Sequence, residues 1–210
     1  NVKVKDAIVD RFRELKGRRP DSGSDFSGLV IQVYWKETQA IVYLNTSGET
    51  LAKHGYRKIP GKAPMMEALA AATIFATEWN TRVPFINPMC GSGTLAIEAA
   101  IIADRLPAGI YRKSFGFMHW LDYDKELHAL IEAAALKRIS ESPMPIFASD
   151  IDRRAMDVAE NNAVSALVDE RITWSVEAFE STRPPAERGI LVINPPYGRR
   201  LETDVEETFS

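Results

Sequence analysis

The segment Ile193-Asn194-Pro195-Pro196-Tyr197-Gly198 places polar groups directly after an apolar run. Two prolines cannot continue a central strand, because neither donates a ladder hydrogen bond, so a rigid loop is predicted. The Asn194 side-chain oxygen and the Pro195 carbonyl can accept the two N–H bonds of an exocyclic base amine, orienting its nitrogen for attack. Tyr197 can then stack on an extruded base. A plain proline turn is the alternative interpretation.

A glycine turn precedes this loop at Asn87-Pro88-Met89-Cys90-Gly91-Ser92-Gly93-Thr94. Glycines at 91 and 93 let the backbone turn tightly and approach a ligand, and the following helix offers unpaired N–H groups. The spacing also fits dinucleotide-binding enzymes, in which an acid about 20 residues further on holds the ribose. The next acid that ends a strand is the much more distant Asp150, so a nicotinamide enzyme is the weaker alternative.

Asp150 and Asp152 follow the second predicted strand. A carboxylate at the carboxyl edge of an open α/β sheet lies where such folds bind ligands. We therefore expect Asp150 to accept the hydroxyls of a ribose. Asp152 is predicted to cap the helix that begins at Arg153.

The remaining pattern predicts the elements that position these groups. Strands are expected at 83–86, 145–149, 172–176 and 189–193, and helices at 64–79, 92–104, within 123–139 and at 153–167. This alternation predicts an α/β fold with a doubly wound, mostly parallel Rossmann-like sheet. Before it, a helix at 4–15 and strands at 29–35 and 40–44 predict a small α+β unit.

Composition and charge narrow the class of protein. The 210 residues lack any apolar run long enough to cross a membrane, and one cysteine with three scattered histidines predicts neither a disulfide nor a metal site. A cytoplasmic protein without membrane or metal partners is expected. The net charge is −3, yet residues 1–19 carry seven basic and three acidic side chains, and residues 51–66 carry four basic ones and no acid. Such patches can engage phosphates, although solvated surface charges explain them equally well.

Taken together, Asn87 to Ala100 and Asn194 to Leu201 resemble the 23S ribosomal RNA guanine-N2 methyltransferase family, whose members are often described as N6-adenine-specific DNA methylases. Residues 4–8, 19–20 and 44–57 resemble the second half of a THUMP RNA-binding domain and its exit. Residues 63–72 resemble the helix that precedes the first motif and lines the cofactor site. The resemblance covers essentially the whole chain.

The resemblance implies an S-adenosyl-L-methionine-dependent methyltransferase acting on RNA, at guanine N2 of 23S ribosomal RNA. It implies a partial THUMP-like RNA-binding domain at 1–50, a basic linker at 51–62, and a class I methyltransferase domain at 63–210 that lacks its C-terminal strands. The implied catalytic residues are Asn194, Pro195 and Tyr197, and the implied substrate-binding residues are Pro196, Arg199 and Arg200. The implied cofactor-binding residues are Asn87, Pro88, Cys90, Gly91, Gly93, Thr94, Asp150, Ile151 and Glu177.

Three departures from the family pattern accompany this resemblance. Asn87 stands where the family usually has aspartate, and Glu177 lies where an acid often meets the adenine amine. The chain also stops soon after Tyr197, with four predicted strands where such sheets usually have seven. We therefore expect an excised segment of a longer enzyme, with an exposed apolar edge strand, weak cofactor binding and no activity alone.

Several other residues have competing interpretations. Cys90 is expected to pack rather than attack a base, and Trp120, Trp174 and Phe179 are expected in the core. His54 is expected either to contact phosphate or to lie in a solvated loop, and Arg199 and Arg200 are expected to steer an RNA backbone. An adenine-N6 methylase of DNA or RNA and a non-catalytic RNA-binding fragment remain alternative functions.

Overall fold

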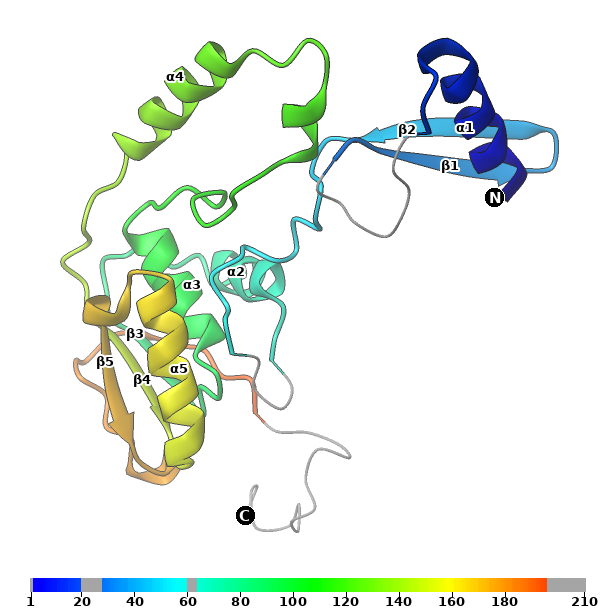
Figure 1. Ribbon diagram of the computed structural model, residues 1–210. Coiled ribbons are helices and arrows are strands. Elements are labelled where there is room, and N and C mark those ends of the chain that lie inside the picture. Colours follow the sequence, from blue (N-terminus) through cyan, green and yellow to red (C-terminus); the bar gives the residue numbers. More distant parts are fainter. Residues whose placement is uncertain (1, 20–27, 60–63, 196–210) are drawn as a thin grey trace. The chain divides into compact units, whose positions relative to one another are not determined.

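The computed structural model describes residues 2–19, 28–59 and 64–195, which form two compact units (Figure 1). The first unit contains residues up to 51 together with 113–128, and the second contains 52–112 and the residues from 129 onward. Within the described residues, no helix is long and apolar enough to cross a membrane.

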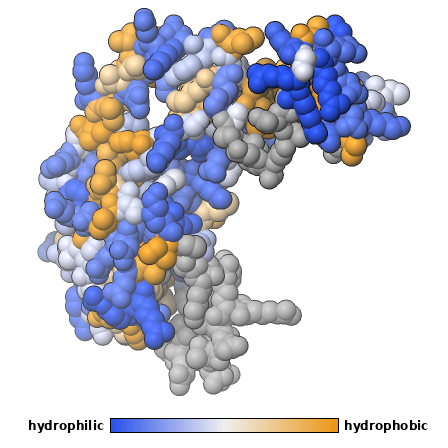
Figure 2. Space-filling model, in the orientation of Figure 1, coloured by the Kyte–Doolittle hydropathy of each residue, from blue (hydrophilic) through white to orange (hydrophobic). Residues whose placement is uncertain are grey.

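The first unit consists of helix α1 (Val2–Lys16) and a hairpin of strands β1 (Val30–Lys36) and β2 (Gln39–Asn45). The strands are antiparallel, with Val33 opposite Val42. The predicted helix and both predicted strands are confirmed to within two residues at each end. Figure 2 shows hydrophilic side chains over α1, in keeping with its many charged residues.

Residues 113–128 pack at the exit of this hairpin, which the sequence did not predict. They include the short 3₁₀ helix η1 (Gly116–His119). The Phe117 amide donates to the Thr46 carbonyl at 2.9 Å, and a Cβ on Gly116 would clash with the Asn45 carbonyl oxygen. Glycine is therefore the residue that lets this segment lie so close to the hairpin. Helix α4 (Lys125–Leu136) begins in the same segment and continues into the second unit.

The second unit is built on a parallel sheet in the order β5–β4–β3–β6. Its strands are β3 (Phe85–Pro88), β4 (Ile146–Asp150), β5 (Ile172–Val176) and β6 (Ile190–Leu191). All three neighbouring pairs are parallel, which confirms the predicted α/β class. The chain runs outward from β3 to β5 and returns to β6 on the other side of β3. Open α/β sheets bind ligands beside such a reversal, at the carboxyl ends of the strands.

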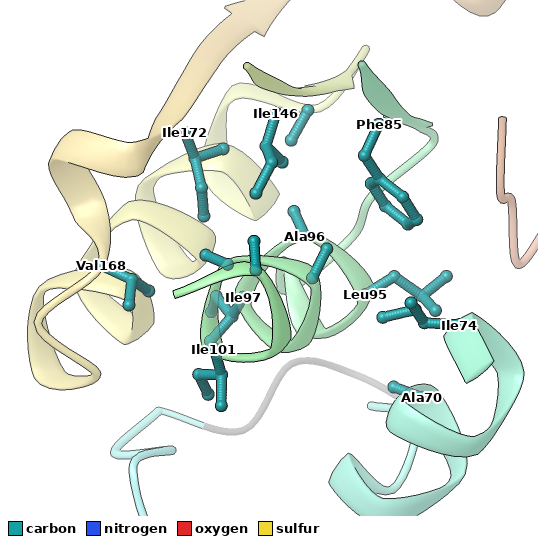
Figure 3. Close-up of a cluster of buried hydrophobic side chains, with 14 of the residues drawn as sticks. Ala70, Ile74, Phe85, Leu95, Ala96, Ile97, Ile101, Ile146, Val168 and Ile172 are labelled. Carbon is teal, nitrogen blue, oxygen red and sulfur yellow. The ribbon is translucent and has the colours of Figure 1, made fainter. Parts of the chain in front are cut away.

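Helices α2 (Glu67–Ala76), α3 (Thr94–Ala103) and α5 (Arg153–Ser165) pack around this sheet, with short 3₁₀ turns η2 (Asp169–Arg171) and η3 (Phe179–Ser181) beside β5. Nearly every residue of α3 is buried, as expected of a helix that is apolar on all sides. Figure 3 shows Ile97 of α3 among the side chains of Ile146, Ile172 and Val168. The core therefore lies directly behind the glycine turn that begins α3.

The bounds of three predicted elements of this unit differ from the structure by one to three residues at each end. The strand predicted at 83–86 lies at Phe85–Pro88, and the strand predicted at 189–193 is reduced to Ile190–Leu191. The helix predicted from residue 64 begins at Glu67 and ends before Trp79, whose indole nitrogen donates to the Val83 carbonyl at 2.8 Å. The Trp79 indole thus bonds to the loop that follows α2, four residues along the chain.

Candidate active site

A pocket of about 520 Å³ opens at the carboxyl ends of the strands of the second unit. Its walls come from the loops that follow β3, β4, β5 and β6 and from the residues just before α2. It is lined by Pro64, Met65, Asn87, Met89, Cys90, Gly91, Ser92, Thr94, Leu95, Asp150, Ile151, Asp152, Ala155, Glu177, Ala178, Phe179, Glu180, Asn194 and Pro195. The Gly91 turn and the Asn194-Pro195 loop, far apart in the chain, thus meet at one rim of the sheet.

Glycine is favoured at positions 91 and 93 of the turn for different structural reasons. Gly91 has a φ of 55° and open space where a Cβ would lie, so its backbone faces the pocket. Gly93 has a φ of 79°, but a Cβ there would lie 2.9 Å from the Ala159 Cβ and 3.2 Å from the Trp174 ring. Gly93 is buried against α5 and β5, outside the described pocket lining. Its absent side chain permits this helix packing, and its contact with a ligand stays a prediction.

Asp150 joins the loops that follow two strands. Its Oδ2 accepts the Gly91 amide at 2.8 Å, and its Oδ1 accepts the Asp152 amide at 3.0 Å. Each carboxylate oxygen keeps a further lone pair for a ligand hydroxyl. Asp152 caps α5, as predicted, by accepting the Arg154 amide at 2.9 Å.

The loop after β5 brings Glu177 and Phe179 to the same pocket. The Glu177 amide donates to the Asp150 carbonyl at 3.1 Å, and its carboxylate accepts the Ser175 hydroxyl at 2.7 Å. Phe179 is 43% exposed and lines the pocket, so the expectation that it belongs to the core is wrong. Ile151, 73% exposed, lines the pocket as well. Phe179 is the first residue of η3, after β5 has ended.

Asn194 and Pro195 line the pocket on the β6 side. Pro196, Tyr197, Arg199 and Arg200 lie outside the described residues. The segment just before Asn194 is fixed by Asn87, whose side-chain amide nitrogen donates to the Val192 carbonyl at 2.8 Å.

Asn87 is fully buried, and its Oδ1 has no hydrogen-bond partner among the described residues. A buried carbonyl oxygen without a partner indicates a place for a donor supplied by a ligand or water. An ionised aspartate, the residue usual in the resembled family, has no hydrogen to donate to the Val192 carbonyl. Asparagine at position 87 therefore provides a hydrogen bond that aspartate would not. Pro88, in contrast, is buried in the sheet and outside the described pocket lining, so its contact with cofactor stays a prediction.

Cys90 lines the pocket but is poorly suited to nucleophilic attack. Burial raises the pKa of its thiol to about 12, with a further contribution from the charge of Asp150. Its sulfur lies 3.6 Å from the Met156 sulfur. The thiol therefore stays protonated near neutral pH and packs, as expected from the sequence. Trp174 likewise packs against the core.

The basic connector before α2 is tied into this unit. His54 Nδ1 lies 2.8 Å from Glu98 Oε1, and its side chain is only 13% exposed. The hydrogen bond to Glu98 raises the pKa of His54, although burial opposes the shift. Both interpretations made from the sequence, a phosphate contact and a solvated loop histidine, are wrong, because the histidine is paired with a buried glutamate of α3.

Four carboxylates line the pocket, from Asp150, Asp152, Glu177 and Glu180, and the described lining contains neither lysine nor arginine. A concave surface with one sign of charge concentrates ligands of the opposite sign. The pocket thus favours a ligand with a positive centre and opposes a ligand with several phosphates.

Sequence reasoning missed four functional candidates. Phe179 is predicted in the core, Arg57 only as part of a basic patch, and Glu67 and Glu98 only as parts of the family resemblance, with no role of their own. Glu67 and Glu98 carry a signal that could have found them: each is an acid within an otherwise apolar helix. Such a position predicts a buried partner of opposite charge.

Among curated proteins, the chain is 41% identical over 207 residues to "Ribosomal RNA large subunit methyltransferase K/L" of Shewanella woodyi, and 40% identical over 205 residues to the protein of the same name from Shewanella pealeana. These alignments cover 96% and 95% of the chain, and 29% of each relative. The chain therefore spans less than a third of the length of these relatives.

Three solved structures share the fold. SMU.472, described as a methyltransferase and complexed with SAH, aligns with a TM-score of 0.81 at 31% identity, over 97% of this chain and 54% of that one. A Clostridium difficile 630 protein described as a methylase aligns with a TM-score of 0.79 at 35% identity. This alignment covers 95% of this chain and 52% of that one. A Listeria monocytogenes protein described as an N6-adenine-specific DNA methylase aligns with a TM-score of 0.82 at 35% identity. This alignment covers 98% of this chain and 54% of that one.

A family model described as "RMKL-like, methyltransferase domain" matches residues 54–208. The match begins at the connector and includes every residue of the pocket lining. Since the match spans most of the sequence, the chain belongs to the RMKL-like methyltransferase domain family.

Proposed function

We propose that this chain carries the catalytic pocket of an S-adenosyl-L-methionine-dependent methyltransferase that methylates an exocyclic base amine in RNA, at guanine N2 of the large-subunit ribosomal RNA. The observation that carries this proposal is the shared pocket, which joins the Gly91 turn to Asn194 and Pro195. A methyl donor and a base amine must meet in one cavity for direct transfer. The names of the two Shewanella relatives support ribosomal RNA as the substrate.

The charge of the pocket supports the choice of cofactor. S-adenosylmethionine carries a positive sulfonium, whereas a nicotinamide dinucleotide carries a negative pyrophosphate. Four carboxylates in the described lining attract the first and repel the second. The complex of SMU.472 with SAH agrees with this preference.

Asp150 and its neighbours are proposed to hold the nucleoside part of the cofactor. The free lone pairs of Asp150 would accept the ribose hydroxyls, and the Glu177 carboxylate would accept the adenine amine. Ile151 and Phe179, which come shortly after Asp150 and Glu177 in sequence, expose apolar surface to the pocket, and such surface suits a planar ring. Gly91 would let the backbone approach the sulfur-bearing chain.

Asn194 and Pro195 are proposed to act on the base. When bound, the cofactor supplies an electrophilic methyl group on a positively charged sulfur. The Asn194 Oδ1 and the Pro195 carbonyl would accept the two amine N–H bonds, which frees the nitrogen lone pair from conjugation with the ring and directs it. The same oxygens stabilise the positive charge that develops on nitrogen before its proton leaves to solvent. The base-binding side of the pocket is also predicted to include Tyr197, which would stack on the base, and the substrate-binding residues Pro196, Arg199 and Arg200.

The first unit is proposed to contribute RNA affinity. Residues 1–50 resemble part of a THUMP domain, and α1 exposes several lysine and arginine side chains. The connector contributes less positive charge than its sequence suggests, because His54 and Arg57 are paired with Glu98 and Glu67.

A second candidate is methylation of adenine N6. The Listeria relative is described as an N6-adenine-specific DNA methylase, and two acceptor oxygens suit either purine amine. Incubation with labelled S-adenosylmethionine and undermodified ribosomal RNA, followed by nucleoside analysis, separates the two. N2-methylguanosine supports the first proposal, and N6-methyladenosine supports the second.

Asn194→Ala tests whether the chain is a catalyst. We expect a loss of transfer of about 100-fold or more, as for the removal of one polar group that stabilises charge in a transition state, with cofactor affinity changed by less than about 2-fold. Asn161→Ala is a matched control, because Asn161 is an exposed asparagine on α5 that bonds to the Asp157 carbonyl. A wild-type chain that binds RNA but yields no methylated nucleoside would instead support a non-catalytic RNA-binding fragment.

A further inference from the structure

Arg57 lies behind one wall of the pocket and is bonded to two residues that line it. Its Nη2 donates to the Met65 carbonyl at 2.7 Å and to the Thr94 Oγ1 at 2.9 Å. Both acceptors line the pocket, whereas Arg57 does not. The guanidinium therefore touches the site only through these neighbours.

The guanidinium is held in place from the opposite side. Its Nε lies 3.7 Å from the Oε1 of Glu67, a buried residue at the start of α2. The Arg57 side chain is 16% exposed, so its charge is largely withdrawn from water and its geometry is restricted. A charged donor in such surroundings forms stronger hydrogen bonds than a neutral one.

The chain around Arg57 is fixed at both ends. Upstream, His54 is paired with Glu98. Downstream, the buried Asn162 of α5 accepts the amides of Lys58 and Ile59 at 3.3 and 3.2 Å, and donates to the Ile59 carbonyl at 3.1 Å. Arg57 is therefore presented to the pocket wall by a segment anchored to α3 and α5.

The bond from Arg57 determines what the Thr94 hydroxyl can do. Because its oxygen accepts from the guanidinium, its hydrogen is left to be donated. Within the described residues, Ser92 Oγ lies 3.4 Å from Thr94 Oγ1, which is a long contact. An acceptor atom of a molecule in the pocket would be the better partner.

We propose that Arg57 is a positioning residue that presents the Thr94 hydroxyl as a donor to the carboxylate of the methyl donor's amino-acid part, an inference that rests on the proposed function. Four carboxylates line the pocket and no lysine or arginine does so in its described part, so a ligand carboxylate needs neutral donors. The Thr94 hydroxyl, backed by a guanidinium, is such a donor. Arg57, whose charge is paired with Glu67, thus acts as a charged donor behind the hydroxyl without entering the pocket.

The test compares S-adenosylmethionine with its decarboxylated analogue, by calorimetric binding to the 210-residue chain. In wild type, removal of the carboxylate should weaken binding about 10-fold, the typical effect of losing a hydrogen bond to a charged group. Arg57→Gln should weaken binding of S-adenosylmethionine by about the same factor and leave binding of the analogue unchanged. Arg57→Lys should retain more affinity than Arg57→Gln, because it keeps the charge.

Thr94→Val should show the same selectivity, and the double variant Arg57→Gln/Thr94→Val should lose no more than the larger single loss, because both residues act through one hydroxyl. Losses that multiply, or equal losses for both donors, would overturn the proposal. Should Arg57→Gln fail to fold, as judged by circular dichroism, Thr94→Val and Arg57→Lys with both donors decide the matter.

Arg171→Gln is the matched control. Arg171 is a half-buried arginine of the same unit, paired with the buried Asp104 at 2.7 Å and outside the pocket lining. It should lower thermal stability without changing either affinity. A wild-type chain that binds neither donor would overturn the proposed function itself, whereas binding that is indifferent to Arg57→Gln overturns only the role of Arg57.

Discussion

The two units use similar sequence patterns but bury them to different extents. In the second unit, apolar residues of the sheet, α2, α3 and α5 form one continuous core. In the first unit, Val9 is the only buried apolar side chain among the described residues, and Trp35 and Val42 are 62% and 63% exposed. Periodicity therefore predicts secondary structure in both units, but it does not predict which faces find a partner.

The difference bears on where the functional groups are placed. Every residue lining the pocket belongs to the second unit. Sites built on packed elements keep their geometry better than sites on weakly packed ones. We therefore expect stability and cofactor binding to depend on the second unit, and substitutions in the first unit to affect them little.

The largest effect should come from the core of the second unit. Ile97→Ala removes a fully buried side chain of α3 and should lower the free energy of unfolding by about 2–5 kcal/mol. Ile41→Ala, on β2 of the first unit, should cost less than about 1 kcal/mol, because Ile41 is 48% exposed. Urea denaturation followed by tryptophan fluorescence measures both. Equal losses would remove the distinction between the units.

A pair of glycines sharpens the comparison. Gly17 and Gly93 both have positive φ, 68° and 79°, but a Cβ on Gly17 meets open space, whereas one on Gly93 meets Ala159 and Trp174. Gly17→Ala should cost about 1 kcal/mol from backbone strain alone. Gly93→Ala should cost about 2–3 kcal/mol, since overpacking adds to that strain. Similar midpoints in thermal unfolding for the two variants would contradict the packing argument.

The smallest effect should be a pH dependence located in the second unit. The hydrogen bond to Glu98 raises the pKa of His54 above 6.5 in the folded chain. Protonated His54 thus stabilises the fold, fully below pH 6.5, and this stabilisation is lost as the pH rises through the higher folded pKa. His54→Gln should flatten that part of the profile of unfolding free energy against pH. Glu98→Gln should flatten it too, and an unchanged slope in both variants would refute the pairing.

The sheet and the shared pocket could be predicted because they follow from local signals. Each cofactor or base motif comes directly after an apolar strand, and the carboxyl ends of parallel strands meet at one edge. The sequence alone therefore predicts that Asp150 and Asn194 lie near each other. The cap at Asp152 followed equally from its position before α5.

The second layer of the site could not be predicted, because its partners are far apart in sequence. His54 meets Glu98 and Arg57 meets Thr94 across 44 and 37 residues, respectively. Nothing in the composition of the connector distinguishes a cation that will be buried from one that will stay in water. Phe179 was misplaced for a related reason: an aromatic residue after a strand packs inward or lines a pocket depending on how the loop turns.

Residues 113–128 have a consequence for how the molecule is made. They complete the first unit by docking at the hairpin exit, yet 61 residues, 52–112, separate them from the rest of it. At a synthesis rate of about 5–20 residues per second, the hairpin waits roughly 3–12 s on the ribosome before this segment emerges. Cleavage of the chain between residues 51 and 52 would not separate the two units, because Gly116 and Phe117 of the first unit would stay on the C-terminal fragment.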